Sequence, residues 1–137
     1  MPGIPHLSHF TVRRDRFLML STLYDTILID LGDGSKMEEL DKDQLPDLIR
    51  TSTTIAAGNV VGGSGHAIVQ VTPNSVRIID LASGFASSKW PSEGDLKYVR
   101  RTISAASVNA TQVLVVFQGG TLVYLTIDED LRLIESS

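Results

Sequence analysis

Histidines are the first side chains to test for chemistry, and two of them, His6 and His9, stand three residues apart. Two imidazoles at this spacing could share a metal ion on one helix face, but Pro5 disfavours a helix there and no carboxylate stands at a supporting spacing. His66 follows Ser64, which invites a nucleophile–base pair. That pair lacks both a nucleophile elbow and a suitably spaced orienting acid. We therefore predict no metal site and no catalytic site at the histidines.

A glycine-rich stretch runs from Gly58 to Gly65 with the sequence GNVVGGSG. A phosphate-binding loop would need Lys and then Ser or Thr after its glycines, followed by a helix. Here His66 and a strand-like segment follow instead. We predict a flexible loop between strands and expect no cofactor.

Carboxylates gather in two places, and neither has the pattern of a site. Asp128, Glu129 and Asp130 form an acidic run between two predicted strands, where solvation would keep them from general acid–base work. A second group, Asp41, Asp43 and Asp47, lacks the glycine and terminal glutamate of an EF-hand loop. The chain has no cysteine, so thiolate catalysis and Cys-ligated zinc are excluded. We predict that the chain is not an enzyme.

Two further motifs have a simple structural interpretation. Asn109-Ala110-Thr111 matches a glycosylation sequon, but without a secretory signal it is more simply a turn before a hairpin. Trp90, followed by Pro91, is predicted to be an anchor packed between sheets. An exposed hot spot for a protein partner is the alternative, because tryptophan is enriched at such spots.

Composition sets the class of molecule in which these residues sit. The chain has 137 residues and a mass of 14.9 kDa, with 42% hydrophobic and 20% charged residues. This is the size and composition of one globular domain. The net charge of −4 argues against non-specific binding to nucleic acid or to an anionic membrane. No apolar run approaches the roughly 18 residues of a membrane span.

Three similar hairpins dominate the pattern. Each combines a β-rich segment, a short turn and a second β-rich segment, and the first segments begin at Phe17, Ala67 and Val113, 50 and 46 residues apart. In the third turn, at least one of Gly119 and Gly120 should have a positive φ. A period of 40–50 residues with several short strands is typical of β-propeller blades.

Each hairpin needs flanking strands to make a four-stranded blade. Small-residue segments at Ser52–Gly58 and Arg101–Ser107 are predicted as innermost strands. More polar segments are predicted as outer strands: Lys36–Leu40, Gly84–Trp90 and Leu131–Glu135. For the first of these a short helix is the alternative, because Ser35–Glu38 resembles a capping box before Asp41–Arg50. Residues 1–16 are predicted to be an irregular lead-in.

The predicted fold class is therefore all-β, with about three four-stranded antiparallel blades of an incomplete β-propeller over residues 17–137. A closed propeller takes four to eight blades, so we expect the segment to be part of a larger propeller. Alone, it should form oligomers or aggregates through its uncovered end blades. The alternative is a small two-sheet β-sandwich.

The third hairpin also resembles a known family. The segments Ile103–Val116 and Leu122–Leu125 are similar to the large damaged-DNA-binding protein, whose family includes the large subunit of the cleavage and polyadenylation specificity factor and a splicing-factor relative. The resemblance extends to further segments: Phe17–Ser21, Gly58–Val60, Ile68–Thr72, Ser75–Arg77 and Trp90. It is a distributed pattern that covers about residues 17–137.

The resemblance implies the opening blades of the second of three propellers. In the damaged-DNA-binding member, that propeller engages the cullin scaffold of a ubiquitin ligase, and the other two form the cleft for substrate receptors. The implied function is a non-enzymatic interaction scaffold in the DNA damage response. The implied location is the nucleus, with the cytoplasm as a second location. Nucleic acid would be contacted only indirectly or through other parts of the full-length protein. The alternative is a segment of an RNA-processing scaffold with a nucleic-acid-binding role. No partner-binding residue is carried over from the family.

Overall fold

The computed structural model describes residues 8–12 by their backbone and residues 17–31, 38–40, 45–60, 67–81, 83–92, 95–98 and 100–136 in full. It is an array of three four-stranded antiparallel sheets, each a meander of strands in chain order. The first sheet holds β1 (Ser8–Val12), β2 (Phe17–Ser21), β3 (Thr26–Asp30) and β4 (Glu38–Glu39). The second holds β5 (Ala56–Asn59), β6 (Ala67–Val71), β7 (Val76–Asp80) and β8 (Ala86–Trp90). The third holds β9 (Ile103–Val108), β10 (Gln112–Phe117), β11 (Leu122–Ile127) and β12 (Leu133–Glu135), after a short 3₁₀ turn η1 (Leu96–Tyr98).

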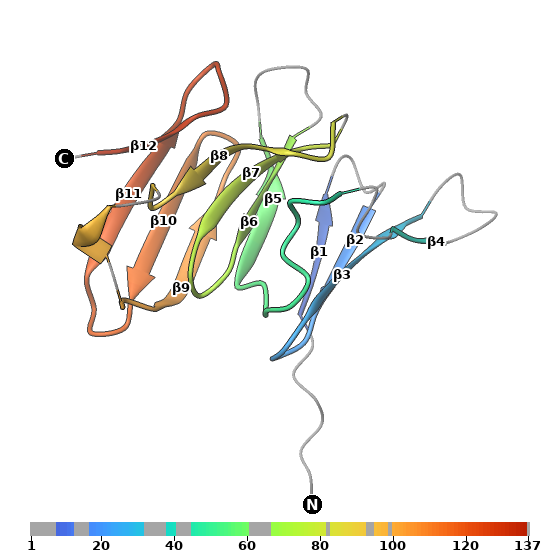
Figure 1. Ribbon diagram of the computed structural model, residues 1–137, viewed down its shortest axis with the longest axis horizontal. Coiled ribbons are helices and arrows are strands. Elements are labelled where there is room, and N and C mark those ends of the chain that lie inside the picture. The colour runs from blue at the N-terminus through green and yellow to red at the C-terminus, as the bar shows by residue number, and fades with distance from the viewer. Residues whose placement is uncertain are drawn as a thin grey trace, which may run out of the picture.

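The sheets follow one another across the molecule, from the blue first sheet to the orange and red third sheet (Figure 1). Their inner strands lie next to each other, β1 beside β5 and β5 beside β9. The approach is close at Gly58 of β5, where an added Cβ would stand 3.0 Å from Cγ1 of Val108 in β9. The prediction of small residues on the inner strands thus has a steric basis. This open arrangement confirms the predicted all-β partial β-propeller, and each sheet is one blade.

The second blade is buried on both faces, which shows why the two-sheet sandwich alternative is wrong. All five residues of β6 are buried. Val69 and Val71 belong to the hydrophobic cluster shared with the third blade, whereas Ile68 belongs to the cluster shared with the first blade. Because successive side chains of a strand point to opposite faces, a fully buried strand requires a neighbour on each side. A two-sheet sandwich would cover only one face of each sheet.

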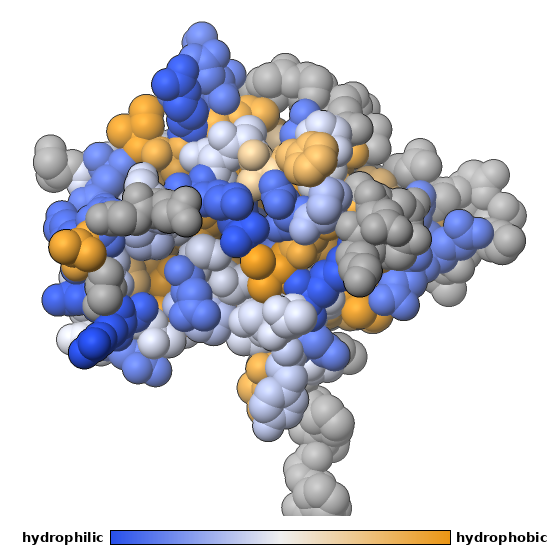
Figure 2. All heavy atoms as spheres, viewed as in Figure 1, coloured by the Kyte–Doolittle hydropathy of each residue, from blue (hydrophilic) through white to orange (hydrophobic). Residues whose placement is uncertain are grey.

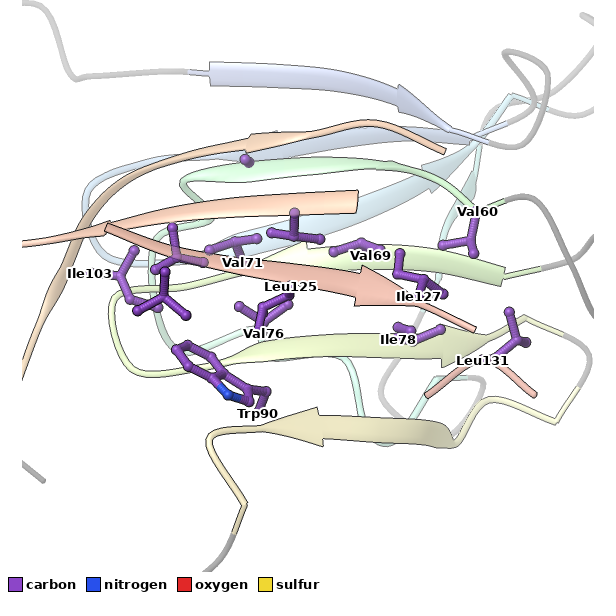
Figure 3. Close-up of a cluster of buried hydrophobic side chains, with 14 of the residues drawn as sticks. Val60, Val69, Val71, Val76, Ile78, Trp90, Ile103, Leu125, Ile127 and Leu131 are labelled. Carbon is purple, nitrogen blue, oxygen red and sulfur yellow. The ribbon is translucent and has the colours of Figure 1, made fainter. Parts of the chain in front are cut away.

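The cluster between the second and third blades is the larger of the two. It joins side chains of β6 and β7 to side chains of β10 and β11, and they point toward one another in the close-up (Figure 3). Trp90 closes this cluster at the end of β8, with a ring centroid 4.9 Å from that of Tyr98 and 6.0 Å from that of Phe117. Trp90 is only 5% exposed, so its predicted role as an anchor between blades is confirmed.

The prediction of an irregular lead-in at residues 1–16 is wrong for Ser8–Val12. This segment is strand β1, which pairs antiparallel with β2 from Ser8 opposite Ser21 to Val12 opposite Phe17. The cause lies in β2, whose backbone groups on the inner edge need partners that β3 on its other side cannot supply. A five-residue strand beside proline and arginine has little local signal, and the pairing partner decides its state.

The predicted fourth strand of the first blade is confirmed at Glu38–Glu39, where β4 pairs with β3. The predicted strand Lys36–Leu40 lies partly outside the described residues, as do Asp41 and Asp43 of the alternative helix. Residues 45–48 form a turn and residues 49–50 have no regular structure. The predicted inner strand Ser52–Gly58 begins instead at Ala56, because residues 52–54 are held by hydrogen bonds to the first blade. We call residues 45–55 the strap.

No helix in the described part of the chain has the length and apolar character needed to cross a membrane.

The hairpin between β10 and β11 gives a direct test of backbone strain. Gly119 has a φ of 98° and Gly120 a φ of 93°, which confirms the predicted positive φ. No atom would lie within 4 Å of an added Cβ at either glycine, so backbone conformation rather than crowding sets the cost of a side chain. We expect Gly119→Val and Gly120→Val each to lower the free energy of unfolding by about 1–2 kcal/mol.

Urea denaturation followed by circular dichroism would measure these two losses. Gln118→Val is the control, because Gln118 is exposed in the same turn and does not have a positive φ. Unfolding curves for both glycine variants that overlay the unmodified chain would contradict the assignment.

Candidate interaction surfaces

The three hairpins can be aligned on the last pair of opposite residues before each turn. These pairs are Ser21–Thr26, Val71–Val76 and Val116–Leu122. Because alternate residues of a strand point to opposite faces of the sheet, each hairpin then has two sets of four positions, one set on each face. We call the set that points to the preceding blade the leading face, and the set that points to the following blade the trailing face.

In the second blade both faces are covered. Its trailing face consists of Val69, Val71, Val76 and Ile78, all in the cluster with the third blade. Its leading face, toward the first blade, consists of Ile68, Gln70, Arg77 and Ile79. A leading face therefore tolerates polar side chains when the strap supplies hydrogen-bond partners.

The trailing face of the third blade has no neighbour in the described structure. It consists of Leu114, Val116, Leu122 and Tyr124, at the positions that hold the buried trailing face of the second blade. Leu122 is 64% exposed and Tyr124 40% exposed, and Ile134 beside them on β12 is 48% exposed. Large apolar side chains gathered on one exposed sheet face are typical of a contact surface.

The leading face of the first blade likewise has no neighbouring blade among the described residues. It consists of Leu18, Leu20, Ile27 and Ile29, which are paired across β2 and β3 and are half-buried. These four positions match the buried Val113, Val115, Val123 and Leu125 of the third blade. The array thus ends in two apolar faces of complementary type, one trailing and one leading.

A rim of the array carries the turns β2–β3, β6–β7 and β10–β11, which lie along one edge in Figure 1. The first of these turns presents Leu23 and Tyr24, 56% and 79% exposed. Figure 2 shows hydrophilic residues interleaved with smaller apolar areas on the face viewed there. An exposed tyrosine on a rim loop is the kind of side chain that anchors a protein partner. The repeat pattern did not single out this turn, although the Leu-Tyr pair between two strands was visible in the sequence.

A shallow pocket of about 480 Å³ lies against the third blade, between η1 and β11. Its polar part is Glu135, which accepts a hydrogen bond from Lys97 Nζ at 2.9 Å and another from the Tyr98 hydroxyl at 2.8 Å. Leu122 and Tyr124 of the open trailing face also line it. The pocket therefore adjoins that face.

Lys97 and Arg101 place two positive charges in this pocket beside the single carboxylate of Glu135. The hydrogen bond from Lys97 holds the pKa of Glu135 below its usual range. The hydrogen bond to Glu135 raises the pKa of Lys97. The pKa of Tyr98 is also raised, mainly by burial and to a smaller extent by its hydrogen bond to Glu135. At neutral pH all three groups thus keep their ordinary protonation states. Such a site offers no poised acid or base.

Most of the histidines and several of the acidic residues that could do chemistry are not among the described residues. His6, Ser64, His66, Asp41 and Asp43 lie outside the described residues, and of His9 only the backbone in β1 is described. Gly58 and Asn59 belong to β5, while the rest of the glycine-rich stretch after Val60 is not described. Within the described residues, no three or more His, Asp and Glu side chains are grouped so that they could hold a metal ion.

The remaining candidates have structural partners. Asp128 Oδ1 accepts hydrogen bonds from the backbone N–H groups of Asp130 and Arg132, so the acidic run organises the turn into β12. Asn109 Oδ1 likewise accepts one from the N–H of Thr111, as expected for a turn. Asp47 Oδ2 accepts a hydrogen bond at 2.7 Å from the N–H of Ala86 and fastens the strap to the second blade.

Comparison with known proteins agrees with this geometry. Residues 1–137 match the family model described as the RSE1/DDB1/CPSF1 second beta-propeller. DNA damage-binding protein 1 of Oryza sativa subsp. japonica is 28% identical over 128 residues, 93% of this chain and 11% of the relative. DNA damage-binding protein 1 of Solanum lycopersicum is 30% identical over 115 residues, which are 84% of this chain and 10% of the relative. The probable splicing factor 3B subunit 3 of Dictyostelium discoideum is 26% identical over 121 residues, which are 88% of this chain and 8% of the relative. The chain thus spans about a tenth of the length of these curated relatives.

Proposed function

The chain belongs to the family of the RSE1/DDB1/CPSF1 second beta-propeller, and on that premise we propose that it acts as a non-enzymatic scaffold for protein partners. The match of the whole chain to a single propeller of this family is the observation that carries the proposal. It confirms the resemblance found in the sequence. The polar groups described above are engaged in hydrogen bonds within the chain, which also favours binding over catalysis.

The finer proposal is a role in a cullin-type ubiquitin ligase adaptor of the DNA damage response, located in the nucleus. It is supported by similarity to DNA damage-binding proteins of several plants, at 28% to 30% identity. The chain would contribute rim turns and blade shape, with Leu23 and Tyr24 as the side chains we expect at the partner contact. Nucleic acid would be met only through other parts of the assembly.

The second candidate is a segment of an RNA-processing scaffold. The similarity to a probable splicing factor subunit favours it specifically. The charge of the chain opposes a direct RNA contact, because 16 acidic residues outnumber 12 Lys and Arg and the counterion-release contribution to RNA affinity would be small.

A segment exchange would test the first candidate. The matched 115-residue segment of the Solanum lycopersicum relative is replaced by the corresponding residues of this chain, and the chimera is used to pull down a purified cullin N-terminal region. We expect the chimera to bind the cullin region as tightly as the unmodified relative, which is run in the same assay as the reference. Tyr24→Ala in the chimera should weaken binding about tenfold, the scale of a 1.4 kcal/mol contact.

Two controls separate the outcomes. Phe85→Ala removes another exposed aromatic side chain, 58% exposed in the turn between β7 and β8, and should leave binding unchanged. The same exchange into the Dictyostelium discoideum relative, read out by retention of labelled RNA at increasing salt, tests the second candidate. Loss of cullin binding in the first chimera together with salt-sensitive RNA retention in the second would transfer the proposal to RNA processing.

A further inference from the structure

We propose that Lys97, Arg100 and Arg101 form a binding site for a phosphorylated serine or threonine side chain in an extended segment of a protein partner. We call these three residues the basic corner. This goes beyond the proposed function, because it assigns a ligand chemistry to the third blade and makes no use of the partner contact at Leu23 and Tyr24. The argument rests on the local charge, on the place of the basic corner in the array and on the backbone of Arg100.

Positive charge is concentrated at the basic corner. Its three residues lie within five positions of an acidic chain that has only 12 Lys and Arg in 137 residues. Lys97 Nζ is paired with Glu135 at 2.9 Å, but neither Arg100 nor Arg101 forms an ion pair within the described residues. Both arginines are exposed. An arginine without a carboxylate partner can offer its planar fork of N–H donors to an external anion, and this fork matches the oxygens of a phosphate group.

The basic corner lies on the rim, where the linker from the second blade reaches the β10–β11 turn. Arg101 Nη1 donates a hydrogen bond to Thr121 Oγ1 at 3.1 Å, and the N–H of Gln118 donates one to the carbonyl of Thr102 at 2.8 Å. The linker and the turn run along the same edge of the array in Figure 1. Neighbouring blades of a propeller pack face to face, which leaves the rim turns at the surface.

The shallow pocket of about 480 Å³ beside the basic corner is built from elements of this chain, with Lys97 and Arg101 in its lining. Tyr98 between them belongs to the cluster shared by the second and third blades, and Glu135 stands opposite Leu125, a residue of the leading face. The cationic wall of the pocket therefore lies on the side of the third blade that faces the second blade. A following blade would pack on the opposite, trailing face, which the other edge of the pocket adjoins.

The backbone of Arg100 is strained, with a φ of 64°. Arg100 is the third residue of a turn that is closed by a hydrogen bond of 3.1 Å from the N–H of Arg101 to the carbonyl of Tyr98. A turn with a positive φ at its third position favours glycine, because other residues meet a steric cost there. Strained residues of this kind are concentrated at ligand contacts and switch regions. The arginine therefore does not serve the turn, and its charge is assigned to the ligand.

A phosphate monoester matches the basic corner better than other anions do. It carries nearly two negative charges at neutral pH and three acceptor oxygens, whereas a carboxylate carries one charge. Two guanidinium groups without ion pairs match the larger charge, and the hydroxyl groups of Thr121 and Tyr124 in the pocket lining offer further donors. The oxygens of Glu135 already accept hydrogen bonds from Lys97 and Tyr98. The net charge of −4 disfavours a long polyanion such as RNA, so the expected ligand is a single phosphorylated side chain.

Fluorescence anisotropy with a short labelled peptide would test this site. The probe is a Gly/Ala peptide with one phosphoserine, and two matched probes carry serine or glutamate at that place. We expect the 137-residue chain to bind the phosphoserine probe saturably, with a dissociation constant of roughly 1–100 μM. The serine and glutamate probes should bind at least about tenfold more weakly. Binding should also weaken as the salt concentration rises, because the contact is electrostatic.

Three variants locate the binding. Arg100→Gly and Arg101→Gln should each raise the dissociation constant for the phosphoserine probe by about tenfold. Arg100→Gly also separates binding from folding, because glycine relieves the positive φ: its urea midpoint should equal or exceed that of the unmodified chain while its affinity falls. Arg132→Gln is the matched control, since it removes another exposed positive charge, one that is paired with Asp130 at 3.3 Å, and it should leave the affinity unchanged.

The proposal is overturned if the serine or glutamate probe binds as tightly as the phosphoserine probe, if an RNA oligonucleotide binds more tightly, or if Arg132→Gln loses as much affinity as Arg101→Gln. Binding by this chain that is absent from the Solanum lycopersicum chimera would also overturn it, because another part of the longer protein would then cover the basic corner. Arg101→Gln should leave cullin binding by the chimera unchanged, so failure of this proposal and failure of the proposed function are distinguishable.

Discussion

Replacement of Trp90 by alanine is expected to lower the free energy of unfolding by about 3–5 kcal/mol, the range for removing a large buried aromatic side chain. Trp90 is 5% exposed and lies against two other rings, Tyr98 and Phe117, which stack on each other with centroids 5.1 Å apart. The variant loses both the buried area and the paired-ring contribution. Because small domains are stable by only about 5–15 kcal/mol, this is a large share of the total.

Urea denaturation followed by circular dichroism, at one fixed protein concentration, would measure this effect without relying on the fluorescence of Trp90 itself. The matched control is Phe85→Ala, because Phe85 is 58% exposed and its loss should cost under about 0.5 kcal/mol. A Trp90→Ala variant within 1 kcal/mol of the unmodified chain would show that the aromatic cluster does not hold the second and third blades together.

The second large effect is expected at Gln70, a fully buried amide in the middle of β6. Its Oε1 accepts a hydrogen bond at 2.9 Å from the N–H of Ile49, and its Nε2 donates to the Ile49 carbonyl at 2.8 Å and to Thr54 Oγ1 at 2.9 Å. Thr54 in turn is 2.6 Å from the hydroxyl of Thr26 in the first blade. Gln70 therefore ties the strap to the second blade and, through Thr54, to the first.

We expect Gln70→Leu to lower the free energy of unfolding by about 3 kcal/mol, because each buried polar group left without a partner costs about 1–3 kcal/mol. Hydrogen exchange should also show faster exchange of the strap amides, since Ile49 would lose both of its bonds to the side chain. The exposed Gln118→Leu serves as the control for the same chemical change. A neutral or stabilising Gln70→Leu would show that the hydrogen bonds of Gln70 are not needed to hold the strap.

Local chemistry made the hairpins of this protein predictable. Alternating apolar residues with a turn between them specify an antiparallel pair wherever it lies, and the strands at Phe17, Ala67 and Val113 formed as expected. The turn at Gly119 and Gly120 followed for the same reason, because glycine alone adopts a positive φ without steric cost.

Segments with little local signal could not be predicted in this way. Strand β1 forms because the inner edge of β2 needs backbone partners, although its own sequence is typical of an irregular segment. The strap keeps residues 52–54 out of β5 because their hydrogen bonds go to Ser21 and Thr26 of the first blade. Both outcomes depend on contacts with segments elsewhere in the chain, up to 33 positions away.

The sequence by itself determined the repeat and the family of this protein, because both are carried by short segments whose order along the chain is enough to identify them. Only the tertiary structure decided which face of each blade is buried. Gln70, Leu20 and Val115 occupy equivalent positions, yet one is hydrogen-bonded to the strap, one lies on an open face and one is buried between blades. The physical reason is that the environment of a sheet face is set by the neighbouring blade and the strap, and their placement depends on packing across the whole array.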